Sequence, residues 1–411
     1  MQPMASSSSL ARRMASVRAS PTAEISDKVR QLTAAGHPVI NLGEGELDFD
    51  TPLHIREAGI SAISTGETKY TAVTGTAALK AAIIDKFRSE NGLAYEPKEV
   101  IAGAGAKQLI FNALLATVGP GDEVIVPAPY WVSYPDMVRL AEGEPSIVAC
   151  SEADGWKLTP LALERAISSR TRWIILNSPN NPTGAVYSHE EMKALTDVLV
   201  RHPHVLVMSD DIYEHIRYEP EFSTPVAVEP LLRDRTLVVN GVSKGYSMTG
   251  WRIGYAAGPG WLIDAMGVLQ SQSTSNPSSI SQAAAVAALR GGTQFIADWC
   301  VELAARRDIV LKYVAEIGGM QCPMPGGAFY AFINCQALLG RRSPDGTVIS
   351  SDFDLATYLL ERAHVGVIHG SAFGAPGYLR ISYAIDRTTL EEACRRIKTA
   401  IGDLVDPAEN D

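Results

Sequence analysis

The alternation of short apolar runs with helical patterns between residues 97 and 255 restricts the fold more than any other feature of this sequence. Such alternation favours a largely parallel sheet that helices cover on both faces, so the fold class is predicted to be α/β. The expected strands span residues 100–102, 123–126, 146–150, 173–176, 205–209, 236–240 and 252–257, with helices between several of them, for example at 190–200.

The last third of the chain follows a different pattern. Helices are expected at 280–290 and 296–317, and strands at 328–333, 365–368 and 378–383 are mixed with helices at 353–363 and 389–401. This arrangement is α+β, and it predicts a second, smaller domain beside the large one.

Composition excludes several classes of protein. The chain has 411 residues and no apolar run of about 18 residues or more, so no membrane span is expected. Its net charge of −10 is spread along the sequence, which argues against a nucleic-acid partner. The five cysteines form no C-x-x-C pair, and their odd number predicts reduced thiols in the cytoplasm.

Residues 1–23 differ from the rest of the chain. They contain a serine run and several arginines but no acidic residue, a composition that resembles a transit peptide. No strongly amphipathic helix is evident there, and a variable N-terminal start is therefore the preferred interpretation.

In doubly wound sheets ligands bind beyond the carboxyl ends of the strands, so the residues that follow each expected strand are the candidates for chemistry. Residues 102–108, which include Gly105 and Lys107, follow one strand and open a helix, where free N–H groups can bind an anion. A plain tight turn fits equally well, and the spacing of a dinucleotide fingerprint is missing. Trp131 follows another strand, where its ring could stack on a flat ligand or simply pack in the core.

Three further segments add polar groups. Residues 178–184 hold more turn chemistry than one turn needs, which indicates side-chain amides aimed at a ligand. Asp210 follows a strand and could pair with a cation, although capping of a helix would explain it equally well. Lys244 lies among small and apolar residues; burial would make its amine nucleophilic, whereas an isolated lysine is usually solvated.

Together these segments supply a phosphate cradle, a stacking ring, an amide, an acid and a nucleophilic lysine. Pyridoxal phosphate requires such a set, with a lysine for its aldehyde, a carboxylate for its pyridine nitrogen and donors for its phosphate. The residues therefore predict pyridoxal 5'-phosphate as the cofactor and no metal site.

Residues 129–135, 180–184 and 243–255 are highly specific in combination. From about Ser20 to Ile401 the chain resembles the class I aminotransferases of pyridoxal-phosphate fold type I, above all the bacterial aspartate aminotransferase subgroup that includes prephenate aminotransferases. The resemblance implies a large cofactor-binding domain with a mostly parallel sheet at 61–299 and a small α+β domain built from both chain ends at 20–60 and 300–411. Residues 1–19 would be a variable extension.

The resemblance also implies roles at the cofactor. Lys244 would bind it covalently and shuttle the proton, Asp210 would pair with the pyridine nitrogen, and Tyr213 with Asn181 would hydrogen-bond the phenolic oxygen. Tyr70 would reach the phosphate of a neighbouring subunit, which implies a homodimer with shared active sites. The remaining cofactor contacts would be Trp131 on the ring and Ser243, Arg252, Gly105, Ala106 and Lys107 on the phosphate.

For the substrate, Arg380 is similar to the family arginine that binds the α-carboxylate, because its fork fixes orientation as well as charge. Lys107 is similar to the residue of this subgroup that receives the distal carboxylate. The resemblance assigns supporting contacts to Asn181, Trp131, the backbone of Gly45, and Ser20 and Thr22 on the N-terminal segment.

The implied function is transfer of an amino group between an amino acid, with aspartate or glutamate expected, and a 2-oxo acid by a ping-pong mechanism. Alternatives on the same scaffold are an aromatic or prephenate aminotransferase, a β-lyase and a cyclopropane-carboxylate-forming synthase. A ligand-sensing regulator is disfavoured, because the match begins near residue 20 and leaves no room for a DNA-binding domain before it.

Some positions depart from the family pattern. Ala106 replaces a common serine and would lose one phosphate hydrogen bond, worth about 1 kcal/mol. Leu47 stands where proline is usual, and Gly245 follows the lysine where alanine is common. Residues 271–281 contain no arginine for a distal carboxylate, so the dicarboxylate preference depends mainly on Lys107.

Overall fold

The computed structural model describes residues 10–17, 19, 21–218 and 222–406, and its main element is a seven-stranded sheet. The strand order is β2-β8-β7-β6-β5-β3-β4, and all neighbouring strands are parallel except the two pairs that contain β8. The predicted α/β class is thereby confirmed. The strands are β2 (Val100–Gly103), β3 (Glu123–Ala128), β4 (Glu144–Ala149), β5 (Thr171–Asn177), β6 (Leu206–Asp210), β7 (Thr236–Gly241) and β8 (Gly254–Ala257).

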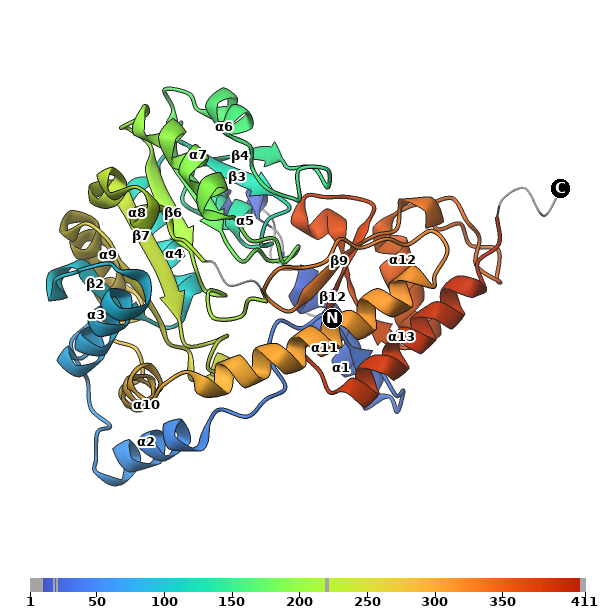
Figure 1. Ribbon diagram of the computed structural model, residues 1–411, viewed down its shortest axis with the longest axis horizontal. Helices are drawn as coiled ribbons and strands as arrows, with labels where there is room; N and C mark the ends of the chain where they lie inside the picture. The colour runs from blue at the N-terminus through green and yellow to red at the C-terminus, as the bar shows by residue number, and fades with distance from the viewer. Residues whose placement is uncertain (1–9, 18, 20, 219–221, 407–411) are drawn as a thin grey trace.

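Helices cover both faces of this sheet (Figure 1) because successive side chains of each strand point to opposite faces. In β2, Ile101 packs with α4 on one face, whereas Val100 and Ala102 pack with α3 and α10 on the other. The helices of this part are α3 (Ala77–Asn91), α4 (Ala106–Thr117), α5 (Tyr134–Leu140), α6 (Pro160–Ala166), α7 (His189–Val200), α8 (Pro225–Val228), α9 (Gly260–Gln272) and α10 (Ser279–Arg290).

A smaller part with its own core lies at the other end of α11 (Gln294–Ala315), the long helix that runs between the two parts (Figure 1). It contains a three-stranded antiparallel sheet in the order β11-β12-β9. The N-terminal segment joins this part because β1 (Ile40–Asn41) pairs with β10 (Val365–Gly366). The other elements here are α1 (Pro21–Ala34), β9 (Tyr330–Asn334), α12 (Asp352–Tyr358), the π-helical η7 (Leu359–Ala363), β11 (Ile368–His369), β12 (Tyr378–Ser382) and α13 (Arg387–Gly402).

Two expected strands differ from the structure. The single strand predicted at 365–368 is wrong, because β10 and β11 divide these residues between two different sheets. The strand predicted at 252–257 begins at Gly254 instead, since Arg252 has a φ of 55°. That left-handed conformation is incompatible with an extended strand.

Helix α2 (Leu53–Ser64) lies beside α10 and projects from the body of the molecule (Figure 1). A domain boundary at residue 60 would cut this helix, and we propose a boundary before α2; the division into domains stays a prediction. Two apolar side chains of α2, Ile60 and Ile63, are 62% and 56% exposed.

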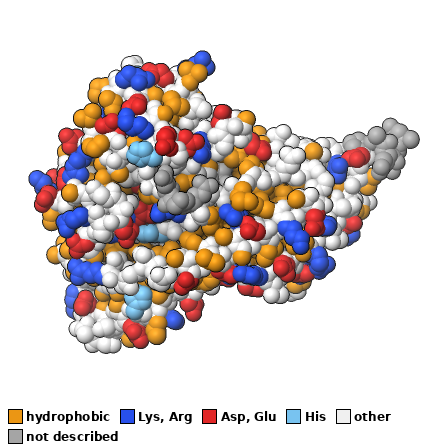
Figure 2. Space-filling view, in the orientation of Figure 1, with side chains coloured by type: hydrophobic (Ala, Val, Ile, Leu, Met, Phe, Trp, Pro, Cys, Tyr) orange, Lys and Arg blue, Asp and Glu red, His pale blue; other side chains and the backbone are white. Residues whose placement is uncertain are grey.

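Acidic and basic side chains are interspersed over the face shown in Figure 2. Among the described residues, no helix is both long and apolar enough to cross a membrane. All five cysteines are free.

Candidate active site

The carboxyl edge of the main sheet is where most of the predicted functional residues meet. The parallel strands β3, β5, β6 and β7 end at this edge, and β8, which runs the other way, begins there. Residues next to these strand ends line a cavity of about 580 Å³. The predicted residues in its wall are Thr22, Gly45, Ala106, Lys107, Trp131, Asn181, Asp210, Tyr213, Ser243, Lys244, Arg252 and Arg380.

Lys244 lies in the connection between β7 and β8, half-buried in the cavity wall. Its Nζ donates a hydrogen bond to the backbone carbonyl oxygen of Gly45. Burial lowers the pKa of the amine to about 8; Glu46 opposes this change, whereas Arg380 and Arg252 add to it. An amine with this pKa is partly neutral near physiological pH and can therefore act as a nucleophile and a base.

Asp210 is the last residue of β6 and is buried. Its Oδ2 accepts a 2.6 Å hydrogen bond from the Tyr134 hydroxyl, and Asn177 Nδ2 donates to its backbone carbonyl at 2.9 Å. Burial raises the pKa of Asp210 to about 6, although the bond from Tyr134 opposes this change. A cationic ring nitrogen beside this carboxylate would offset its desolvation and lower its pKa again.

The N-terminus of α4 faces the cavity, where the first N–H groups of a helix lack intrahelical partners. Gly105 has a φ of 92°, and a Cβ there would lie 2.4 Å from Arg252 Nη2. A Cβ on Gly254 would lie 2.2 Å from the backbone nitrogen of Ala106. Both positions therefore need glycine to bring the guanidinium and the helix N-terminus together, an arrangement that suits a phosphate group.

Lys107 and Trp131 contact each other inside the cavity. The Lys107 Nζ lies 4.7 Å from the centre of the Trp131 ring, within the range of a cation–π interaction. Burial, and to a smaller extent Arg252, lowers the pKa of Lys107. The ring predicted to stack on the cofactor thus also holds the lysine predicted to bind a distal carboxylate.

Arg380 lies in the middle of β12 and is 3% exposed. Its Nη1 donates to Asn181 Oδ1 at 2.9 Å and its Nη2 donates to the Gly43 carbonyl oxygen, whereas its buried Nε has no hydrogen-bond partner within the described residues. The guanidinium lies over the Tyr330 ring, 4.4 Å from its centre. A buried fork with a spare donor suits a carboxylate ligand.

Several wall residues were not predicted from the sequence, among them Tyr134, Asn177 and Tyr330. Tyr134 falls within the recognised stretch 129–135 and Asn177 ends a strand at the functional edge, so both positions carried a signal. Tyr330 carried none, because its strand belongs to the small part. Its hydroxyl lies 2.8 Å from that of Tyr213, so it orients a predicted cofactor contact.

Of the predicted residues that the structure describes, Gly105 and Tyr70 are not part of the cavity wall. Gly105 lies just before α4, against Arg252. Tyr70 is 92% exposed on the surface of the single chain. Ser20 lies outside the described residues.

The donor set of the cavity fits the expected cofactor. The α4 N-terminus and Arg252 can hold a phosphate, Asp210 can hold a ring nitrogen, and the Lys244 amine can hold an aldehyde. The spare Nε of Arg380 leaves a donor for a carboxylate. The individual roles of these residues stay predictions.

Comparisons with known proteins agree with this chemistry. A family model described as aminotransferase class I and II matches residues 37–397. An aspartate aminotransferase of Rhizobium meliloti (strain 1021) is 52% identical over 391 residues, 95% of either chain. An aspartate/prephenate aminotransferase of Cereibacter sphaeroides is 54% identical over 386 residues, which cover 94% of this chain and 96% of that protein.

Solved structures of aspartate aminotransferases have the same fold as this chain. The crystal structure of the aspartate aminotransferase from Rhizobium meliloti matches with a TM-score of 0.93 and 51% identity, over 96% of this chain and 99% of that one. An aspartate aminotransferase from Thermus thermophilus with maleate matches with a TM-score of 0.89 and 40% identity, over 95% of this chain and 99% of that one.

Proposed function

Because this chain belongs to the class I and II aminotransferases, we propose that its cavity transfers an amino group between aspartate or glutamate and a 2-oxo acid. It is a transaminase of the aspartate or prephenate type and uses pyridoxal phosphate. The observation that carries the substrate assignment is the pair of cations in one cavity, Arg380 and Lys107. Together they match the two carboxylates of a dicarboxylic acid.

The chemistry divides between the cofactor and the protein. When bound, pyridoxal phosphate withdraws electrons from the amino acid and so acidifies its Cα proton. Lys244 takes that proton on its neutral Nζ, which its lowered pKa of about 8 favours. Asp210 would hold the ring nitrogen in its protonated form, and the Tyr213 hydroxyl, which Tyr330 orients, would hydrogen-bond the ring.

Substrate recognition uses the second group of residues. Arg380 binds the α-carboxylate in a fixed orientation because Asn181 and the Gly43 carbonyl hold its guanidinium. Lys107 leaves the face of Trp131 to meet the distal carboxylate. The relative from Thermus thermophilus whose structure contains maleate, a dicarboxylate, supports this assignment.

Prephenate is a second candidate amino acceptor. It is supported by the 54% identity to the aspartate/prephenate aminotransferase of Cereibacter sphaeroides. Prephenate carries two carboxylates like oxaloacetate, so the same two cations can bind it. Thr22, in the cavity wall on α1, is near the substrate end and is proposed to close over either acid.

A panel of amino acids and 2-oxo acids that includes prephenate tests the proposal. We expect equimolar formation of a new amino acid and a new 2-oxo acid, with aspartate or glutamate as the best donors. Pyruvate and ammonia from cystathionine would instead indicate a β-lyase, and no exchange with any dicarboxylic donor would refute the substrate assignment.

We also propose a homodimer with shared active sites. Tyr70 is 92% exposed, and the apolar Ile60 and Ile63 of the nearby projecting helix α2 are exposed as well. A second subunit would cover these side chains and bring Tyr70 to the phosphate of the neighbouring site. A cytoplasmic location is proposed from the free cysteines.

A further inference from the structure

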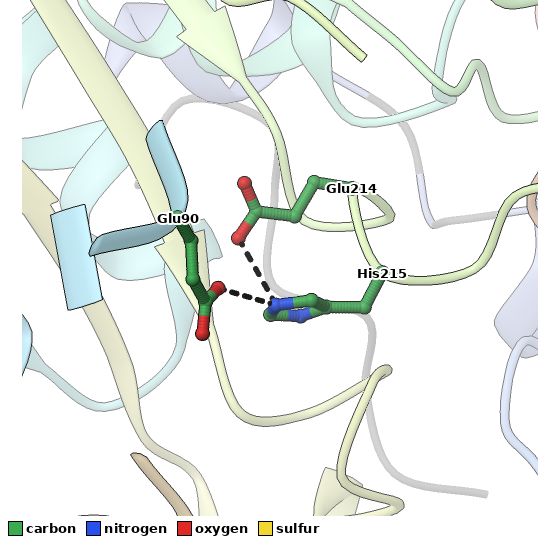
Figure 3. Close-up of side chains that lie close together, drawn as sticks. All are labelled: Glu90, Glu214 and His215. Carbon is green, nitrogen blue, oxygen red and sulfur yellow. Dashed lines mark hydrogen bonds and ion pairs between the residues drawn. The ribbon is translucent and has the colours of Figure 1, made fainter. Parts of the chain in front are cut away.

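Helix α3 and the turn after β6 meet in a partly buried group of charged side chains. The Nε2 of His215 lies 2.7 Å from Glu90 Oε2 and 3.6 Å from Glu214 Oε1 (Figure 3). Lys86 Nζ donates to the same Glu214 oxygen, and Asn91 Nδ2 donates to the other one at 2.8 Å. We call Lys86, Glu90, Glu214 and His215 the anchor cluster.

The anchor cluster supplies its own positive charge. The ligand atoms of Glu90, Glu214 and His215 lie within 4.8 Å of one another, a spacing that would also suit a metal ion. The Lys86 ammonium, however, bonds the Glu214 oxygen that faces His215, so a side-chain cation fills that place. Burial would raise the pKa of Glu214, but Lys86 and His215 hold it at about 2.

The anchored turn carries two residues of the cavity. Asp210 and Tyr213 line it, whereas Glu214, the neighbour of Tyr213, is 3% exposed and bonded to α3. The Glu214 backbone N–H donates to the Asp211 carbonyl at 2.9 Å, which closes a tight turn. A shift of Glu214 would therefore be passed to the Tyr213 hydroxyl and the Asp210 carboxylate.

The His215 ring connects the anchor cluster to the reacting lysine. A Cβ on Gly245 would lie 3.0 Å from His215 Nδ1 and 3.1 Å from His215 Cβ, so the imidazole packs on the backbone next to Lys244. The Tyr246 ring meets His215 edge-on, with 5.7 Å between the ring centres. This close packing gives a structural reason for glycine at 245, where alanine is common in the family.

We propose that the anchor cluster is a positioning unit for transamination, with His215 as its contact to the Lys244 connection. It fixes three cofactor-contacting groups from behind: Asp210 and Tyr213 through the turn, and Lys244 through Gly245. The inference rests on the proposed function, because it concerns the geometry of that reaction. Arg380 and Lys107 lie on other elements, so substrate affinity should not depend on the cluster.

The test measures kcat, KM and the visible absorption of the bound cofactor against pH in the holoenzyme. In His215→Ala we expect kcat to fall by about tenfold to a hundredfold, because small displacements of reacting groups have effects of that size. KM for both substrates should stay within about twofold. The pH midpoint of the cofactor absorption should move, since the surroundings of Lys244 change.

Lys86→Met tests the other end of the cluster, with Arg88→Met as its matched control. Arg88 lies on the same helix but pairs with Asp85 at the surface. We expect Lys86→Met to lower kcat as His215→Ala does and Arg88→Met to leave kcat unchanged. A lower Tm with unchanged kcat and unchanged absorption midpoint in both cluster variants would overturn the proposal.

Gly245→Ala avoids the risk that Lys86→Met fails to fold because the buried Glu214 loses its ammonium partner. Alone it should lower kcat, because the new Cβ displaces the His215 ring. Combined with His215→Ala it should lower kcat by less than the product of the two single effects, because the contact with the imidazole is gone and only the 3.1 Å contact with the Cβ of residue 215 remains. Independent multiplication of the two effects would overturn the proposal. The substrate panel with the wild-type protein tests the proposed function separately. The midpoint of the cofactor absorption is measured without substrate, so it tests the positioning role even if the proposed substrates are wrong.

Discussion

Lys244 at the proposed cofactor end of the cavity and Arg380 at the proposed substrate end are cations that the protein holds differently. Burial lowers the pKa of both Lys244 and Arg380. Lys244 stays partly exposed to the cavity with the Gly45 carbonyl as its hydrogen-bond acceptor, whereas Arg380 is 3% exposed and is held by Asn181 and a backbone carbonyl. The lysine can therefore exchange its proton near neutral pH, but a guanidinium stays charged.

The two ends also differ in how the chain builds them. Asp210 ends β6, and Lys244 and Arg252 lie in the connection between the neighbouring strands β7 and β8, so the order of one sheet brings them to a common edge. Arg380, Gly45 and Thr22 come from the small part and the N-terminal segment, far apart in the sequence. The residues proposed for proton transfer are therefore held by a single sheet, whereas substrate binding depends on how the large and the small part of the chain pack against each other.

Replacement of Lys244 should have the largest effect at either end. Lys244→Ala removes the only amine expected to bind the cofactor and to carry the Cα proton, so kcat should fall by about 10⁴-fold or more, as when a group that acts in covalent and acid–base steps is lost. The visible absorption of the lysine-bound cofactor should also disappear. Lys193→Ala, on the exposed face of α7, serves as the control. Normal transamination by Lys244→Ala would refute the assignment.

Arg380→Lys should impair substrate binding although it keeps a positive charge at this position. An ammonium cannot reproduce the planar fork that Asn181 and the Gly43 carbonyl orient, so KM for both substrates should rise by about a hundredfold. The absorption of the bound cofactor should be unchanged. Arg395→Lys is the matched control, because Arg395 lies exposed on α13 and pairs with Glu392. A fall in kcat alone would contradict the division between the two ends.

The contrast between the two ends also separates what the sequence predicts from what it does not. Asp210 and Lys244 were predictable because strand alternation locates the functional edge and each residue follows a strand. Tyr330 was not, since nothing local connects β9 to Tyr213. The residues at 365–368 read as one apolar strand, because a sequence does not show that neighbouring residues pair with different partners. The burial of Lys86 beside Glu214 is likewise a long-range contact.

Lys107→Met should show whether Lys107, rather than Arg380, binds the distal carboxylate at the substrate end. The loss of one charge-assisted contact to the distal carboxylate should lower kcat/KM for aspartate by about tenfold. Alanine, which lacks that carboxylate, should react as before, so the aspartate-to-alanine selectivity falls. Lys157→Met removes a surface ion pair with Glu191 and is the control. Unchanged selectivity would show that another residue receives the distal carboxylate.

A change in the proton affinity of Lys244 is the smallest expected effect and gives the most specific test of the cofactor end. In the cofactor-free protein, covalent attachment of pyridoxal phosphate requires the neutral amine, so its rate should rise with pH through about 8. Glu46, whose carboxylate accepts a 2.7 Å hydrogen bond from Thr249, raises the pKa of Lys244. Glu46→Gln should therefore lower that pKa and move the rate profile to lower pH.

This shift should be small and sensitive to salt, because Glu46 is exposed and its charge is screened by ions. High ionic strength screens the charge of Glu46 and should therefore reduce the difference in pH between the wild-type and Glu46→Gln profiles. Stopped-flow absorbance measures both profiles. A shift to higher pH would mean that Glu46 does not raise the pKa of Lys244 through its charge.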